Sequence, residues 1–278
     1  MFSSGRKLLI GMIHLPRLPS TSIRCETDVS SVLETAVREA TTLIGEGFDA
    51  VLVENFGDSP YLKRVEDPLT IAFMTVVVRE VVRSVNAPVG INLLRNSGLE
   101  AYSIAVASGA KFIRVNALVE TLITDSGIIE PEAPRMRGVR LNYPGVKVFA
   151  DVVSKHAASL TYTQRHAQIK HTTATDSHER VLESLILDLA ERGGADAVVV
   201  TGLRTGAEPD ERTLKEVREY SKIPVLVGSG LNPRNAEKLL RHADGAIVGS
   251  YVRVDGRAGN PLSIERVREL VKAARSLE

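Results

Sequence analysis

The sequence has little of several residue types, and each shortage excludes a class of protein. Its single cysteine, Cys25, cannot form an internal disulfide, which excludes a disulfide-stabilised scaffold and agrees with a reducing cytoplasm. Cys25 lies in a polar segment, RCETD, without a partnering motif, so we interpret it as an incidental thiol rather than a catalytic one. Tryptophan is absent and arginine outnumbers lysine, a composition that points to a thermophile host.

Strong net charge and long apolar runs are also missing. A formal net charge of +1 gives no bulk attraction to nucleic acid or anionic membrane, so we expect a small ligand bound by local charge. No uninterrupted apolar segment reaches the length that spans a bilayer. The first sixteen residues lack a small-residue cleavage site and a full-length signal core, so we interpret them as leading into a first strand. The sequence therefore predicts a cytoplasmic protein with no membrane span.

What is present is a regular alternation of β-branched apolar runs with amphipathic segments. At 278 residues, 44% of them hydrophobic, the chain suits one large core, and we expect a single domain over residues 1–278. Eight such units favour a closed (β/α)8 TIM barrel over an open doubly wound sheet. The expected strands span residues 8–15, 49–56, 88–94, 112–118, 147–153, 197–202, 223–230 and 245–250. The expected helices span residues 29–46, 69–86, 97–108, 135–142 (weakly patterned), 177–193, 210–221, 232–242 and 262–276.

Two of the loops that follow expected strands are long, at residues 119–134 and 154–176. Structureless loops of that length in a compact domain usually cover a site or bind a ligand. Asp125, in the first of them, is predicted to close over the mouth of the barrel.

The last two expected strands both end in glycine and serine. In a TIM barrel the loops after strands 7 and 8 form a phosphate site, and glycines there leave backbone N–H groups accessible to an anion. Asn232-Pro233 is typical of a helix start directly behind the first pair of glycines. The alternative is that these are only tight turns between strand and helix. We favour a phosphate site formed by Gly228, Ser229, Gly230, Gly249 and Ser250.

Polar residues end several of the other strands. Parallel strands of a barrel end at one mouth, so these side chains are expected to form a substrate pocket there. Glu54 and Asp151 are predicted as an acid/base pair or as ligands of a divalent cation. The alternative is that they form ion pairs with Arg95, Arg114 or Lys155 that hold the barrel top together. The residues expected to bind substrate hydroxyls are Asn92, Asn116, Thr201 and Gly202.

Lys155 and His156 follow the fifth expected strand. Lys155 is predicted to stabilise negative charge rather than to form a Schiff base, because it already lies in the loop. His156 is predicted as a general acid or base, whereas His14 is interpreted as a hydrogen-bonded residue of the mouth. The histidine spacing matches no zinc motif.

Several ordered motifs resemble the BtpA/SgcQ family from end to end. The matching segments are GMIHLPRLP (11–19), VENFGDSPY (53–61), GINLLRNSG (90–98), RVNALVETLITDSGIIE (114–130), FADVVSKHAASL (149–160), VVVTGLRTG (198–206) and VLVGSGLNPRNA (225–236). The resemblance implies a ribulose-phosphate-binding type of TIM barrel. It also implies either a role like that of the cyanobacterial photosystem I biogenesis protein or, through the SgcQ relatives, sugar metabolism. It supplies no settled reaction and therefore no assigned catalytic residues.

Two functions follow from these observations. The first is an enzyme on a phosphorylated sugar or nucleoside-like compound, acting by lyase, isomerase or glycosidic-cleavage chemistry, which the sequence does not separate. The second is a non-catalytic assembly or regulatory factor, for which we expect an exposed apolar patch. The converging polar residues favour the enzyme, and a homo-oligomer is left open.

Overall fold

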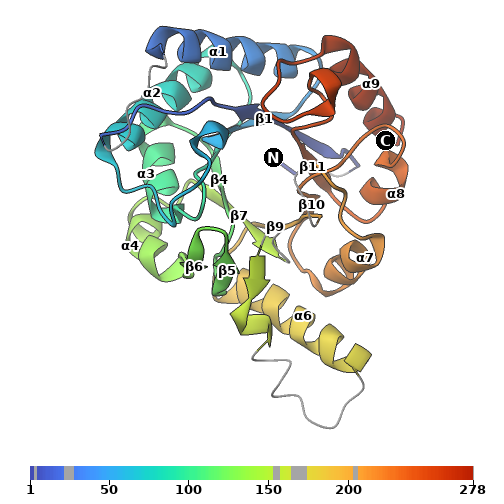
Figure 1. Cartoon of the computed structure of the whole chain (residues 1–278). Coiled ribbons are helices and arrows are strands. Elements are labelled where there is room, and N and C mark those ends of the chain that lie inside the picture. The colour runs from blue at the N-terminus through green and yellow to red at the C-terminus, as the bar shows by residue number, and fades with distance from the viewer. Residues whose placement is uncertain (3–4, 22–27, 153–156, 164–173, 203–205, 278) are drawn as a thin grey trace.

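The protein is described from a computed structural model, shown in Figure 1. The structure describes residues 1–2, 5–21, 28–152, 157–163, 174–202 and 206–277, and for residues 174–178 the backbone alone. In chain order the elements are β1 Leu8–His14, α1 Val29–Gly45, β2 Ala50–Glu54, η1 Phe56–Asp58, α2 Pro68–Ser84, β3 Val89–Asn92, α3 Gly98–Ser108, β4 Phe112–Val115, β5 Leu122–Thr124, β6 Gly127–Ile129, α4 Ala133–Asn142, β7 Lys147–Val152, β8 Ala157–Ser159, α6 Ala174–Glu191, β9 Ala197–Val200, α7 Glu211–Tyr220, β10 Val225–Val227, α8 Ala236–Leu240, β11 Gly245–Val248, η2 Val254–Gly256 and α9 Ile264–Arg275.

Eight strands form a closed parallel barrel in the order β1-β11-β10-β9-β7-β4-β3-β2. Helices surround this ring on its outside in Figure 1. The predicted TIM barrel is therefore confirmed. Among the described helices, none combines the length and the apolar character needed to cross a membrane.

The interior of the barrel is a separate apolar core, distinct from the larger core between strands and helices. The rings of Phe112 and Phe149 stack there with centroids 4.9 Å apart. The ring of Phe2 contacts Phe149 at 5.8 Å and packs against this interior core. Gly90 of β3 makes room for Phe112, since a Cβ atom at position 90 would lie 2.3 Å from its ring. One small residue is thus needed for a large ring to fill the barrel.

Replacing Gly90 with alanine is expected to lower the free energy of unfolding by about 1–3 kcal/mol, because the added methyl overpacks the barrel interior. Gly138→Ala is the matched control: this residue lies in α4 and nothing lies within 4 Å of a Cβ there. Since alanine is the better helix former, the control is expected to gain about 0.5–1 kcal/mol. Urea denaturation of both variants measures the difference, and equal stabilities would contradict this packing of Phe112.

The structure corrects two local predictions. The loops expected to be structureless contribute a small antiparallel sheet of order β6-β5-β8, with β5 and β6 forming a hairpin after β4. The hairpin is held to the barrel by the Ser126 hydroxyl, which donates to the carbonyl of Tyr61 at 2.8 Å. The helix predicted at Asn232 begins instead at Ala236. The Asn232 side chain accepts from the N–H of Arg234 at 2.9 Å, a turn that delays the helix.

Candidate functional site

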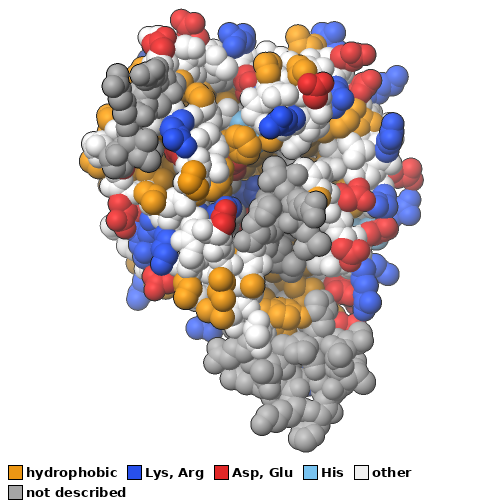
Figure 2. Space-filling view, in the orientation of Figure 1, with side chains coloured by type: hydrophobic (Ala, Val, Ile, Leu, Met, Phe, Trp, Pro, Cys, Tyr) orange, Lys and Arg blue, Asp and Glu red, His pale blue; other side chains and the backbone are white. Residues whose placement is uncertain are grey.

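At the carboxyl ends of several neighbouring strands, the side chains that point toward the barrel interior are polar. His14 lies in register with Glu54, Glu54 with Asn92, and Asn92 with Arg114, so four adjacent strands place a polar residue at one level. Figure 2 shows a hollow near the centre of the view, with acidic and basic side chains at its edge. The cavity there measures about 340 Å³. It is lined by Met12, His14, Glu54, Phe56, Ser59, Tyr61, Asn92, Leu94, Arg95, Arg114, Asn116, Asp125, Gly206, Gly228, Ser229, Gly230, Gly249 and Ser250.

Glu54 is the carboxylate that reaches this cavity from the barrel wall. It is 7% exposed, and its Oε2 accepts from Nδ2 of Asn92 at 2.6 Å. Glu54 therefore presents a carboxylate at the cavity wall that is oriented by the amide of Asn92.

Asp151, the other predicted acid, has a different environment. It is 1% exposed and does not line the cavity. Its two oxygens accept from Arg114 Nε at 2.8 Å and Nη2 at 3.0 Å, and Oδ2 also accepts from Asn116 at 2.9 Å. This arrangement matches the ion-pair alternative for Asp151, because its oxygens are occupied by side chains that do face the cavity.

Arg114 remains charged in this environment. Burial alone would lower its pKa, but the charges of Asp151 and Glu54 and the hydrogen bonds to Asp151 raise the pKa above its ordinary value. A permanent cation thus lies in the cavity wall, in electrostatic contact with Glu54.

The five residues predicted to bind phosphate lie together on the wall of this same cavity. Gly230 has a φ of +77°, and a Cβ atom there would lie 2.2 Å from the backbone nitrogen of Glu208. Only glycine fits that conformation and that approach. No group of the described residues accepts a hydrogen bond from the backbone N–H of Gly230, Gly249 or Ser250. These N–H groups are the donors that an anion would use.

Three of the predicted binding residues, Ser229, Gly202 and Thr201, contact neighbouring loops of the site. The Ser229 hydroxyl donates to the carbonyl of Ala207 at 2.8 Å and accepts from the N–H of Gly202 at 3.3 Å, so it ties two loops together. Gly202 and Thr201 do not line the cavity. The Thr201 side chain lies against Gly228, where an added Cβ would be 2.7 Å from its methyl group.

Three further residues complete the cavity on the side of the β5–β6 hairpin. Arg95 stacks on the ring of Tyr61, with Cζ 4.9 Å from the ring centroid, and Nη2 donates to both oxygens of Asp125 at 2.7 and 3.0 Å. Burial and the charge of Glu54 raise the pKa of Tyr61 well above its ordinary value, so its hydroxyl stays protonated. Tyr61 escaped the sequence reasoning because it lies in a loop beyond the strand end, although it closes the VENFGDSPY motif.

The predictions for Lys155 and His156 lie outside the described residues. Within the described part of the chain, no three His, Cys, Asp or Glu side chains come together as a metal site. Arg114 donates to Asp151 and is in electrostatic contact with Glu54, so one cation lies between the two predicted acids, and their role as cation ligands stays a prediction.

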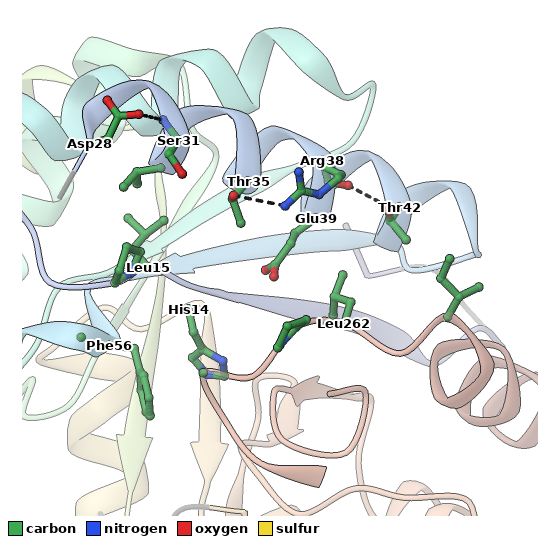
Figure 3. Close-up of a pocket in the computed structure, with 16 residues that line it drawn as sticks. His14, Leu15, Asp28, Ser31, Thr35, Arg38, Glu39, Thr42, Phe56 and Leu262 are labelled. Atoms are coloured by element: carbon green, nitrogen blue, oxygen red, sulfur yellow. Dashed lines mark hydrogen bonds between the residues drawn. The ribbon is translucent and has the colours of Figure 1, made fainter. Parts of the chain in front are cut away.

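A larger cavity of about 830 Å³ lies outside the barrel, between α1 and the segment that leads into α9 (Figure 3). Its charged side chains are already bonded: Asp28 caps α1, Arg38 donates to Thr35, and Glu39 is paired with Arg253. Figure 3 shows Glu39 pointing from α1 into this groove, with His14 and Phe56 at its lower side. We therefore place the candidate site at the barrel mouth.

A parallel barrel with a polar mouth at the carboxyl ends of its strands defines the class as a TIM barrel. The chain belongs to the BtpA family, whose profile matches residues 5–276. It is 45% identical over 273 residues to an uncharacterized protein of Thermococcus kodakarensis, covering 98% of this chain and 97% of that one. It is 36% identical over 267 residues to the photosystem I biogenesis protein BtpA of Synechocystis sp., covering 95% and 87%.

Solved structures of the same fold are more distant. N-(5'-phosphoribosyl)anthranilate isomerase from Pyrococcus furiosus superposes with a TM-score of 0.58 at 18% identity, covering 98% of this chain and all of that one (100%). (S)-3-O-geranylgeranylglyceryl phosphate synthase from Thermoplasma acidophilum, solved in complex with sn-glycerol-1-phosphate, gives 0.57 at 17% identity, covering 98% and 94%. Similarity at this level shows the shared fold.

Proposed function

We propose that this protein is an enzyme that acts on a small phosphorylated sugar or nucleoside-like compound. One observation carries the proposal: the backbone N–H groups after β10 and β11 and the Glu54 carboxylate line one cavity. A volume of about 340 Å³ suits a small metabolite. The Thermoplasma barrel with bound sn-glycerol-1-phosphate supports a phosphorylated ligand for this fold.

In this proposal the phosphate binds at Gly230, Gly249 and Ser250, and the reacting part of the substrate lies over Glu54. Gly228 lines the cavity, but its N–H already donates to the carbonyl of Val200 at 2.7 Å. Glu54 is the general acid or base, because it is buried, oriented by Asn92 and faces the cavity. Arg114 stabilises negative charge that develops on the substrate, while Asp151 positions Arg114 and Asn116. The reaction is proton transfer on the phosphorylated substrate, a step that lyases and isomerases share.

Ligand-induced stabilisation of the wild type and of Ser250→Asp tests this proposal. In a thermal-shift screen of phosphorylated sugars and nucleotides, a ligand at a hundred times its dissociation constant should add about 2.7 kcal/mol of stability to the wild type. Ser250→Asp is expected to abolish that gain through charge repulsion, whereas the matched control Ser250→Ala keeps most of it. Position 250 is preferable to Gly230, where any side chain would collide with the backbone of Glu208.

The proposal fails if no phosphorylated compound stabilises the wild type, or if Ser250→Asp keeps the full shift. Thermal unfolding of both variants without ligand provides the check that they fold normally.

A non-catalytic assembly factor is the second candidate. Ile123 and Ile128 face each other across the β5–β6 hairpin and are 44% and 50% exposed, and Leu160 beside them is 41% exposed. Such a patch is typical of an interaction surface, and the name of the Synechocystis relative supports an assembly role. If this function holds, a charged residue at Ile128 abolishes complementation of a deletion strain and Glu54→Gln does not.

A further inference from the structure

Arg95 presents a hydrogen-bond donor that the described part of the protein leaves unused. Its Nε is buried and has no partner among the described residues, although the side chain as a whole is 12% exposed. The guanidinium is fixed by stacking on Tyr61 and by Nη2 binding to Asp125. A buried donor without an acceptor is unfavourable, so this geometry is expected to be completed by a ligand in the cavity.

Asn92 presents a complementary group at the end of β3, which lies three positions from β11 and four from β10 around the ring. Its Nδ2 donates to Glu54, which leaves Oδ1 as an acceptor, and Oδ1 is buried without a partner among the described residues. Asn92 is 1% exposed and lines the same cavity. Its acceptor suits a substrate hydroxyl.

The partners of the two arginines in the cavity indicate which of them can bind an anionic group of a ligand. Arg114 is committed to the fully buried Asp151 through two hydrogen bonds. Arg95 is paired with Asp125, whose side chain is 62% exposed, and an ion pair with such a partner contributes little stability. An anionic group of a ligand can therefore replace Asp125 at Arg95, or share Arg95 with it, with little loss of protein stability.

The strand order places this cation across the mouth from the phosphate donors. Arg95 follows β3, and Gly228 to Gly230 follow β10, which lies four positions from β3 in either direction around the eight-stranded ring. A ligand that contacts both must span the mouth.

We infer that Arg95 binds a second anionic group of the substrate, so that the substrate is a phosphorylated polyhydroxy acid. Its phosphate lies at the loops after β10 and β11, its carboxylate accepts from Arg95, and a hydroxyl between them donates to Asn92. This inference rests on the proposed function, because it assigns the phosphate to the same glycines.

Matched pairs of ligands test it. 6-Phosphogluconate and sorbitol 6-phosphate differ only in a carboxylate against a hydroxymethyl group, and so do 3-phosphoglycerate and glycerol 3-phosphate. Calorimetric dissociation constants are measured for the wild type, Arg95→Met, Asp125→Asn and Ser250→Asp. We expect the wild type to prefer the acid by about tenfold or more in the longer pair, which is long enough to span the mouth. Arg95→Met should reduce the preference to about one without weakening the polyol, and Asp125→Asn should increase it.

The outcomes distinguish a failure of the role inferred for Arg95 from a failure of the proposed function. Equal binding of acid and polyol in both pairs, or an acid preference that survives Arg95→Met, overturns the role of Arg95. If Ser250→Asp still weakens all binding in that case, the phosphate site stands. Absence of binding by all four compounds overturns the inference, while the thermal-shift screen decides the function separately. Binding that Ser250→Asp leaves unchanged overturns both.

Discussion

Arg114→Met is expected to lower the free energy of unfolding by about 3–5 kcal/mol, because it leaves the Asp151 carboxylate buried without its cation. The side chains of Arg114 and Asp151 are 4% and 1% exposed, and two hydrogen bonds of 2.8 and 3.0 Å join them. Of the hydrogen bonds that the carboxylate accepts from described residues, the one from Asn116 would then remain. Urea denaturation followed by circular dichroism measures the loss.

The double variant Arg114→Met/Asp151→Leu removes the whole ion pair, whereas Arg114→Met leaves the Asp151 charge isolated. Replacing a whole buried ion pair with apolar residues of similar volume is often close to neutral, so we expect most of the lost stability to return. A loss below about 1 kcal/mol in Arg114→Met, which is the range of an exposed pair, would contradict the burial described for Asp151.

Glu54→Gln is expected to lower turnover of the phosphorylated substrate by about 10²–10⁴-fold, the usual contribution of general acid or base catalysis. Glutamine has the same shape and can still contact Asn92, but it cannot accept or donate the transferred proton. Binding of the phosphorylated ligand should change much less than turnover, because the phosphate donors lie on other loops. The measurement is kcat and the dissociation constant for a compound identified by the thermal-shift screen.

Glu265→Gln in the first turn of α9 is the matched control, since it makes the same change on an exposed residue outside the cavity. Its turnover should equal that of the wild type. Turnover by Glu54→Gln within a factor of about three of the wild type would show that Glu54 only positions Asn92.

The sequence predicted the barrel and the level of its polar residues because both follow from the strand period. Side chains alternate inward along each strand, so Glu54, Asn92 and Arg114 had to meet at the mouth once the strands were placed. The same period also places Thr201 on the inward side, after Ala197 and Val199, but this residue does not line the cavity. Its methyl group lies against Gly228, a contact that the period does not predict.

The partners of the carboxylates could not be predicted in the same way. Arg114 lies near the end of β4, and Arg95 and Lys155 come after β3 and β7 in the sequence, so each was a possible partner. Side-chain geometry is needed to show that Asp151 pairs with Arg114 and that Arg95 pairs with Asp125. The β5–β6 hairpin also escaped prediction, because strands of three residues are too short to show a period. That hairpin brings Asp125 to the cavity, which agrees with the position expected for this residue over the mouth.

A crystal structure with a bound phosphorylated ligand tests most directly whether the glycine-ended loops hold the phosphate. We predict phosphate oxygens within about 2.7–3.2 Å of the backbone nitrogens of Gly230 and of Gly249 or Ser250, with the rest of the ligand above Glu54. A phosphate bound in the groove between α1 and Leu262, with the mouth of the barrel closed by side chains of the protein, would contradict the account.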